Sequence, residues 1–126
     1  MPAEALAILL TDGSYSRAHY AFVLATAAGA LGRPVSLFAT NAGCHALMAN
    51  WSGLADATRD EVIRARGVAG LDELREAARE LGVRLMVCEA GLRSEGIDPG
   101  LLMPDVEVTG VASFLEAARG GQVLTL

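Results

Sequence analysis

The sequence predicts an α/β fold, in which a mostly parallel sheet of five strands lies between helices on both faces, giving three layers. Short runs rich in Leu and Val alternate along the chain with Ala-rich helical runs. This alternation is typical of strands that are joined by crossover helices into a parallel sheet. The chain contains no internal repeat, low-complexity tract or long linker, so we expect one domain over residues 1–126.

The first expected elements are a strand over residues 5–10 and a helix over residues 16–31. The strand is apolar throughout, which is typical of a strand buried on both faces. Ser14 and Ser16 are both candidate N-caps of the helix. After His19 the helix has almost no polar face, so either its alanines are tolerated at a surface or a second subunit covers them. We favour the second interpretation, a homo-oligomer.

The middle of the chain begins with a strand over residues 35–39. The pattern of residues 40–68 is weaker, and we expect only short helices there, over 44–51 and 60–66. An amphipathic helix follows over 71–81, because its apolar residues line one side and its charged residues the other.

The second half of the chain supplies five further elements, with glycines closing the helices. They are a strand at 83–87, a helix at 89–95, a strand at 106–108, a helix that Thr109 caps and that runs to Arg119, and a strand at 123–126. The helix at 89–95 follows its strand without a linker, which places a strand end directly against a helix start.

Composition excludes several classes of protein. The chain is 52% hydrophobic and 20% charged, which excludes a disordered chain. Its net charge of −5 makes it a poor candidate for nucleic-acid binding. All ten basic residues are Arg, so chemistry that needs a lysine is excluded. No apolar stretch approaches the roughly 20 residues that span a bilayer, so no transmembrane segment is expected.

The start of the sequence and the cysteine count favour a cytoplasmic protein. The first residues have no basic leader and read as a strand, so we expect no secretory signal. Two cysteines without such a signal are typical of a reducing compartment. Cys44, Cys88, His19 and His45 lack metal-ligand spacing, and nucleotide-binding glycine motifs are absent. We therefore expect no metal and no cofactor.

The candidate site lies at the carboxyl edge of the predicted sheet, where ligands bind in parallel α/β proteins. Both cysteines fall on the loops at this edge. The other pocket candidates there are Asp12, Gly13, Ser14, Asn41, His45, Glu89 and Thr109.

Cys88 is the candidate catalytic residue, because a thiolate at a strand-to-helix junction meets unpaired backbone N–H groups. These groups favour the thiolate over the thiol. Glu89 opposes it as a like charge, and so does Asp12 if its loop lies near. The alternative is a buried, inert cysteine that fills the strand end.

Cys44 is a candidate second thiol. His45 follows it, but adjacent helical residues point about 100° apart, so the two side chains need not touch. A small packing residue is therefore the favoured interpretation of Cys44. If the second and third strands are neighbours, however, Cys44 can approach Cys88 and form a redox disulfide.

Two blocks of sequence resemble the DsrE/DsrF-like family, especially its peroxiredoxin-like DsrE branch. The pattern LxELxxxAxELGVxLxxC is matched from Leu71 to Cys88, and PxVEVxGVAxFLExA is matched from Pro104 to Ala118. The resemblance extends over most of the chain and is loose between Thr40 and Thr58. The TxxC motif of true peroxiredoxins is absent, because position 85 is Leu.

The resemblance implies a DsrEFH-like α/β/α sheet, flavodoxin-like in appearance, and assembly into homo-oligomers, commonly trimers or hexamers. It also implies an active-site cysteine at Cys88. In sulfur-relay members this cysteine carries sulfane sulfur as a persulfide and passes it to a small sulfur-carrier protein. No metal or organic cofactor is implied.

Three functions therefore remain open. The first is a sulfur carrier, and a candidate sulfurtransferase, that works through Cys88. The second is a non-catalytic oligomeric module that binds a small molecule or anion at the strand ends. The third is a thiol redox protein that pairs Cys44 with Cys88. Family resemblance favours the first, although a fold does not by itself fix an activity.

Overall fold

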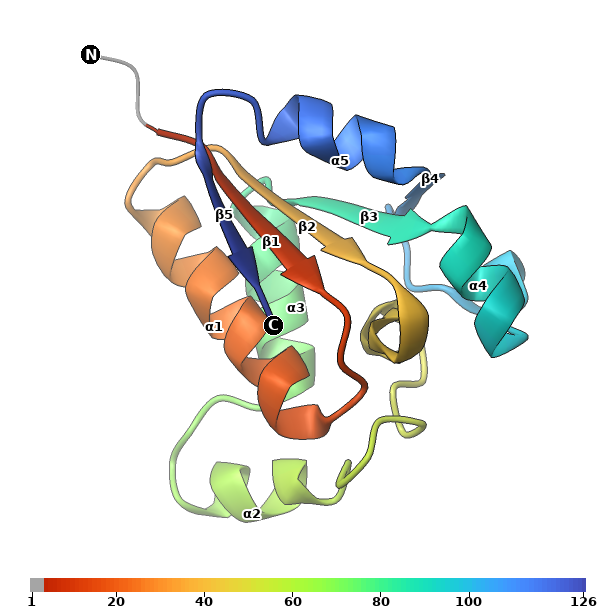
Figure 1. Cartoon of the computed structure of the whole chain (residues 1–126). Helices are drawn as coiled ribbons and strands as arrows, with labels where there is room; N and C mark the ends of the chain where they lie inside the picture. Colours follow the sequence, from red (N-terminus) through yellow and green to blue (C-terminus); the bar gives the residue numbers. More distant parts are fainter. Residues whose placement is uncertain (1–3) are drawn as a thin grey trace.

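The computed structural model describes residues 4–126, which form one parallel sheet with helices on both faces (Figure 1). The strands lie in the order β4-β3-β2-β1-β5, and each neighbouring pair is parallel. Their bounds are Leu6–Leu10 for β1, Val35–Ala39 for β2, Arg84–Cys88 for β3, Glu107–Thr109 for β4 and Gln122–Thr125 for β5. The predicted fold class is confirmed.

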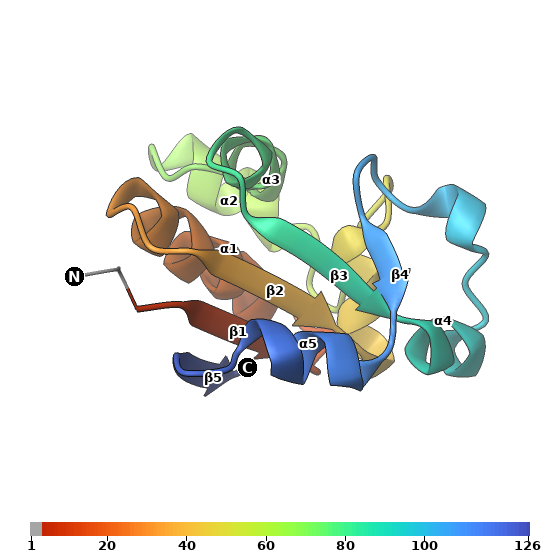
Figure 2. The same cartoon turned by 90° about the horizontal axis from the view of Figure 1, so that it is seen from above.

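The helices form the two outer layers. Figure 2 shows α1 and α3 on one face of the sheet and α5 on the other. The α-helices are α1 (Tyr15–Ala30), α2 (Arg59–Ala65), α3 (Leu71–Glu80), α4 (Glu89–Glu95) and α5 (Val111–Ala117). Two 3₁₀ helices, η1 (Asn41–Leu47) and η2 (Pro99–Leu101), lie between them.

The position of α5 follows from the order of the strands. From β1 to β4 the chain moves in one direction across the sheet, and β5 then returns to the far side of β1. Right-handed crossovers in opposite directions place their helices on opposite faces. The helix between β4 and β5 therefore lies alone on the face away from α1 and α3.

Alternation along the strands divides the core into two parts. The larger part lies under α1 and α3 and includes Ile8, Leu37 and Val87. A smaller cluster lies under α5, and its buried members are Ala7, Phe38, Met86, Phe114 and Ala118. Because successive side chains on a strand point to opposite faces, Met86 and Cys88 both face the α5 layer.

The first helix is covered largely by its own chain. Ser14 is its N-cap, and its hydroxyl accepts a hydrogen bond from the Arg17 amide at 3.3 Å. The buried face of α1 packs into the same core as α3. Tyr20 and Leu31 are its large exposed apolar residues. The cover that we assigned to a second subunit thus comes mainly from within the chain.

Two predicted elements differ in the structure. The helix expected over 44–51 is a 3₁₀ helix that lies earlier, at Asn41–Leu47, because Gly43 packs so tightly against the Leu10 carbonyl that the chain turns sharply. Thr109 does not cap α5. It is the last residue of β4, and Gly110 takes the N-cap position without a side-chain hydrogen bond.

Among residues 4–126, no helix combines the length and apolarity that crossing a bilayer requires.

Candidate functional site

Cys88 occupies the junction between β3 and α4. It is the last residue of β3 and the N-cap of α4, with extended backbone angles. Its sulfur accepts a hydrogen bond from the Gly91 amide at 3.3 Å. The side chain is half-buried against the core cluster under α5. The predicted strand-end thiol is therefore both held by a backbone donor and accessible to solvent.

Gly91 allows α4 to approach η1 closely. A Cβ atom at this position would lie 3.1 Å from the Asn41 nitrogen, the Cys44 sulfur and the Thr40 hydroxyl oxygen. Such contacts are tighter than most Cβ atoms accept. The glycine therefore lets the first turn of α4, whose amide bonds to the Cys88 sulfur, pack directly on η1.

Cys44 lies in a different environment from Cys88. It is fully buried, and its thiol points to the Ala39 carbonyl at 3.8 Å. Burial raises the pKa of Cys44 to about 12, and the charges of Cys88 and Glu95 act in the same direction. Cys44 therefore remains a neutral thiol over the physiological pH range.

The two cysteines pack into different parts of the core. Cys44 belongs to the large cluster under α1 and α3, whereas Cys88 contacts the small cluster under α5. Gly91 lies near both sulfurs, because its amide donates to Cys88 and a Cβ atom at this position would lie 3.1 Å from the Cys44 sulfur. Both thiols are free. The two thiols thus lie close to the same glycine but differ in packing and burial.

The carboxylate next to Cys88 is already paired. Glu89 accepts a hydrogen bond from Arg93 at 2.6 Å, one helical turn further along α4. Both side chains are exposed, so the pair contributes little to stability. The pair matters for the charge near Cys88, because the positive charge of Arg93 offsets the negative charge of Glu89, the residue next to Cys88 in the sequence.

Thr109 lies directly beside Cys88 on the neighbouring strand. The two residues are partners in the parallel register of β3 and β4. The Thr109 hydroxyl donates to the hydroxyl of Ser113 at 2.8 Å. Sequence analysis placed Thr109 at this edge but missed Ser113. Ser113 could have been found from its position four residues after Thr109, because this spacing brings a side chain at the end of β4 next to one in the first turn of α5.

Two other candidates lie along η1. The side chain of His45 bonds to the carboxylate of Glu95 at 3.2 Å, at the opposite end of α4 from Cys88. Asn41 has a positive φ of 50°, and its backbone nitrogen lies close to Gly91. These residues thus hold η1 against α4, and neither side chain has a contact with the Cys88 sulfur among the described contacts.

The candidates after β1 form a separate group. Asp12 accepts hydrogen bonds from Ser14, which lower its pKa, and lies 3.8 Å from Arg17. A Cβ at Gly13 would collide with Ala42, so this loop packs on η1. In the described chain, the contacts of Asp12 are with its own loop and α1, not with α4.

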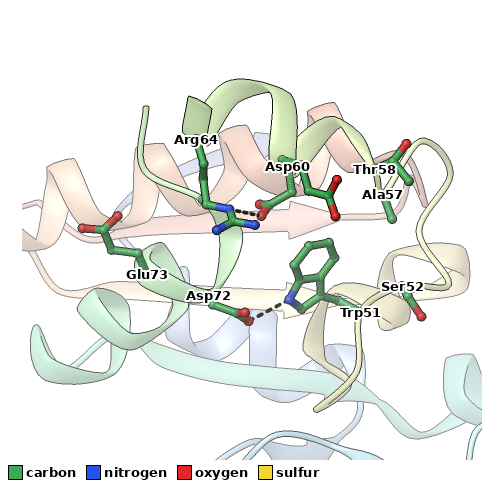
Figure 3. Close-up of a pocket in the computed structure, with 10 residues that line it drawn as sticks. Trp51, Ser52, Ala57, Thr58, Asp60, Arg64, Asp72 and Glu73 are labelled. Carbon is green, nitrogen blue, oxygen red and sulfur yellow. Dashed lines mark hydrogen bonds and ion pairs between the residues drawn. The ribbon is translucent and has the colours of Figure 1, made fainter. Parts of the chain in front are cut away.

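Two surface cavities lie at the same end of the fold, and Cys88 lines neither. One of about 450 Å³ lies beside α2 and the start of α3, where Trp51 stands between Asp60 and Asp72 (Figure 3). The other, of about 500 Å³, is bounded by His45 and Leu101. Of the predicted pocket residues, His45 is the one that lines either of these two cavities.

Two buried charged residues were not singled out by sequence analysis. Asp60 is buried; burial opposes its ionisation, but hydrogen bonds from Tyr15, the Leu71 amide and Arg64 outweigh this and lower its pKa. Arg75 is buried under the segment that follows η1 and donates to three of its carbonyls. A charged residue that packs inward carries no local sequence signature.

No group of three or more His, Cys, Asp and Glu among residues 4–126 is arranged to hold a metal ion. The site is instead defined by one half-buried thiol, a backbone amide and a pair of hydroxyls. The fold and site thus define a parallel α/β protein with an accessible cysteine at the end of its third strand.

One protein family matches most of the sequence that forms this fold and site. The model of the DsrE/DsrF/DrsH-like family matches residues 44–125, which is about two thirds of the chain. The chain belongs to this family.

Two curated relatives extend over nearly the whole chain. Sulfur carrier protein DsrE2 of Allochromatium vinosum is 27% identical over 150 aligned residues, with 94% of each protein covered. The uncharacterized protein YrkE of Bacillus subtilis is 26% identical over 147 residues, with 92% of each covered.

Solved structures agree on the fold. The ychN protein from E. coli superposes with a TM-score of 0.73 and covers all of both chains at 17% identity. MTH1491 from Methanobacterium thermoautotrophicum, a protein of unknown function, gives a TM-score of 0.66 at 17% identity and covers 98% of this chain and 99% of its own. At this identity the likeness concerns architecture alone.

Proposed function

We propose that the protein is a sulfur carrier that holds sulfane sulfur as a persulfide on Cys88 and passes it to an acceptor thiol. The observation that carries the proposal is the half-buried Cys88 sulfur, which accepts a hydrogen bond from the Gly91 amide at the edge of the sheet. The relative named as a sulfur carrier supports the same chemistry. A thiolate with a backbone donor is the nucleophile that this reaction requires.

Each step exchanges one sulfur–sulfur bond for another. The Cys88 thiolate attacks the outer sulfur of a donor persulfide, R–S–SH, so that a new S–S bond forms and the donor leaves as a thiolate. An acceptor thiolate then attacks the outer sulfur of the Cys88 persulfide and releases Cys88 as a thiolate. Neither step needs a net oxidant, a metal or an organic cofactor.

The test is the intact mass of reduced protein after treatment with inorganic polysulfide and removal of the excess. We expect the parent to gain one sulfur atom that a reductant removes. Cys88→Ser should abolish the gain, whereas Cys44→Ser, the matched control, should keep it. A parent that gains no sulfur, or a Cys88→Ser variant that still gains it, would contradict the proposal.

A binding module is the second candidate, because two cavities of about 450 and 500 Å³ open at the same end of the fold. Such a module would retain a small molecule through purification and would not depend on either cysteine. Loss of two hydrogens on mild oxidation, dependent on both Cys44 and Cys88, would instead support the redox alternative.

The proposal includes a homo-oligomer, with a trimer or hexamer expected, and a small sulfur-carrier protein as acceptor in a reducing cytoplasm. Exposed apolar side chains lie on α5 and on the face of β5 that the α5 layer covers. They are 47–60% exposed and comprise Val111, Leu115 and Val123. We assign the subunit contact to this group, the α5 patch, rather than to α1.

A further inference from the structure

The side chains of Cys88 and Thr109 lie next to each other on the same face of the sheet. They are register partners of the parallel strands β3 and β4. Side chains of paired residues on neighbouring strands point to the same face, with their Cβ atoms about 5 Å apart. That face is the one covered by α5, because Cys88 packs against the cluster that contains Phe114.

The first turn of α5 adds a second hydroxyl at this point. Thr109 donates to Ser113 at 2.8 Å, and both side chains are partly buried. Two hydroxyl groups carry two hydrogens, and the bond between them uses one. In the described contacts the pair donates its other hydrogen to no protein group, so it retains one donor.

The retained donor does not serve the thiol itself. The Cys88 sulfur accepts from the Gly91 amide, and no bond from Thr109 or Ser113 to this sulfur occurs among the described contacts. A persulfide extends the side chain by one S–S bond, about 2.05 Å. The outer sulfur therefore lies beyond the Gly91 amide and needs a donor of its own when it is anionic.

The charged donors of β3 and α4 are already engaged. Arg93, on the same helix as Cys88, is paired with Glu89 at 2.6 Å. Arg84 lies at the opposite end of β3 and is held by Glu107 at 2.8 Å. The hydroxyl pair of Thr109 and Ser113 is the side-chain donor that the register of β3 and β4 places beside the sulfur.

We infer that the Thr109–Ser113 hydroxyl pair binds the outer sulfur of the Cys88 persulfide anion. This inference rests on the proposed function and assigns the ligand of the pair, an anionic sulfane sulfur. Gly91 holds the inner sulfur and the hydroxyl pair holds the outer one. The pair therefore stabilises the loaded protein without changing the reactivity of the unloaded thiol.

The test compares three variants after loading with inorganic polysulfide. Thr109→Val keeps the branched shape and removes the hydroxyl; Ser113→Ala removes the second hydroxyl; Thr109→Ser keeps the hydroxyl and is the matched control. The measurement is the rate at which loaded protein, freed of donor, gives its outer sulfur to cyanide as thiocyanate. The attack breaks the S–S bond and returns Cys88 as a thiolate.

We expect Thr109→Val and Ser113→Ala to lose the outer sulfur about tenfold faster, the effect of one hydrogen bond to a charged group. Thr109→Ser should retain it as long as the parent does. The alkylation rate of unloaded Cys88 should be unchanged in all three variants, a readout that a general loss of packing would shift.

Two results overturn the inference in different ways. If Thr109→Val and Ser113→Ala load and retain sulfur as the parent does, the hydroxyl pair has no such role, and the carrier function stands. If the parent itself gains no sulfur at Cys88, the inference and the proposed function fail together.

Discussion

Cys88 and Cys44 carry the same functional group in contrasting surroundings. Cys88 is half-buried with an amide donor, and Cys44 is fully buried with its pKa raised to about 12. Because the thiolate is the reacting form, the native chain should offer one fast thiol. Alkylation with iodoacetamide should label one cysteine per native chain and two after unfolding, and Cys88→Ser should show no fast labelling. Equal labelling rates for both native thiols would contradict this.

The raised pKa of Cys44 makes stability depend on pH. The thiol ionises near pH 9 in the unfolded chain but stays protonated to about pH 12 in the native chain, so the native state binds the additional proton. The free energy of unfolding contains the full contribution of this proton below pH 9. That contribution is lost as the pH rises toward 12, by up to about 1.4 kcal/mol per pH unit. Urea unfolding on both sides of pH 9 measures it.

Cys44→Ala is the control for this dependence. It removes the Cys44 thiol and leaves Tyr15, whose pKa burial also raises, to titrate as in the parent. The free energy of unfolding of the variant should fall less steeply above pH 9 than that of the parent. Parallel curves for the two proteins would show that Cys44 does not cause the decline.

Gly91 both packs against η1 and donates a hydrogen bond to the Cys88 sulfur. Gly91→Ala places a methyl group 3.1 Å from the Cys44 sulfur and the Asn41 nitrogen, so α4 must shift by a few tenths of an ångström. The amide then bonds less well to Cys88, and we expect alkylation of Cys88 to slow by up to about tenfold. Gly110→Ala, where the added methyl meets open space, is the matched control.

The sequence predicted the position of Cys88 at a strand end, but not the hydrogen bonds of Thr109 and Ser113 beside it. The place of Cys88 followed from a buried strand that runs directly into a helix. Thr109 was wrongly predicted as a cap, because its neighbour Gly110 takes that position and leaves the hydroxyl for Ser113. Ser113 was missed because Thr109 was assigned to the helix cap, so the bond between side chains four residues apart was not considered.

Among the elements, η1 and the segment after it are held by one arginine. Arg75 of α3 donates to the carbonyls of Ala46, Met48 and Ala49 at 3.1, 2.6 and 3.3 Å. Its side chain is 8% exposed. These bonds fix a stretch that has little regular hydrogen bonding of its own, and they hold it beside the cavity that His45 lines.

Arg75→Met should therefore destabilise the protein by about 3 kcal/mol, because it leaves several backbone carbonyls without their charged donor. Urea unfolding gives the free energy, and amide hydrogen exchange should show the loss first in residues 46–54. Arg119→Ala removes an exposed ion pair instead and should change stability by less than about 1 kcal/mol. Equal effects of the two substitutions would contradict the role of Arg75.

Elements with strong periodicity were predicted within a few residues, and the region from 40 to 58 was not. β2 and α3 were recognisable because each follows one hydrophobic period. The helix expected over 44–51 was misplaced, because the contact between Gly43 and Leu10 and the bonds from Arg75 determine this segment. Such long-range contacts leave no periodic pattern.

For the whole molecule, alternation of strands and helices was sufficient to predict the class of fold. The order of the strands was not predicted, because any of several orders satisfies the same alternation. The apolar first helix led to α1 as the expected subunit contact, whereas α1 and α3 share one core. Tyr20 and Leu31 are exposed on or beside α1, and Val111 and Leu115 are exposed on α5 in the opposite layer.

The α5 patch gives a test of assembly. Leu115 is 60% exposed on α5, and Leu115→Asp would place a charge at the centre of the proposed contact. We expect light scattering to give the mass of one chain for this variant and a multiple of it for the parent. Val62→Asp, on α2, is the matched control and should leave the assembly intact. A parent with the mass of a single chain would refute the oligomer.

The pairing of β5 with β1 makes the fold depend on contacts between residues that are distant along the chain. Leu6 pairs with Gln122, and the cluster that contains Phe38 and Met86 is completed by Phe114 of α5. Contacts of this kind slow folding, because a long loop must close before they form. We therefore expect the layer that packs against Cys88 to form late in folding, which amide hydrogen exchange during refolding would measure.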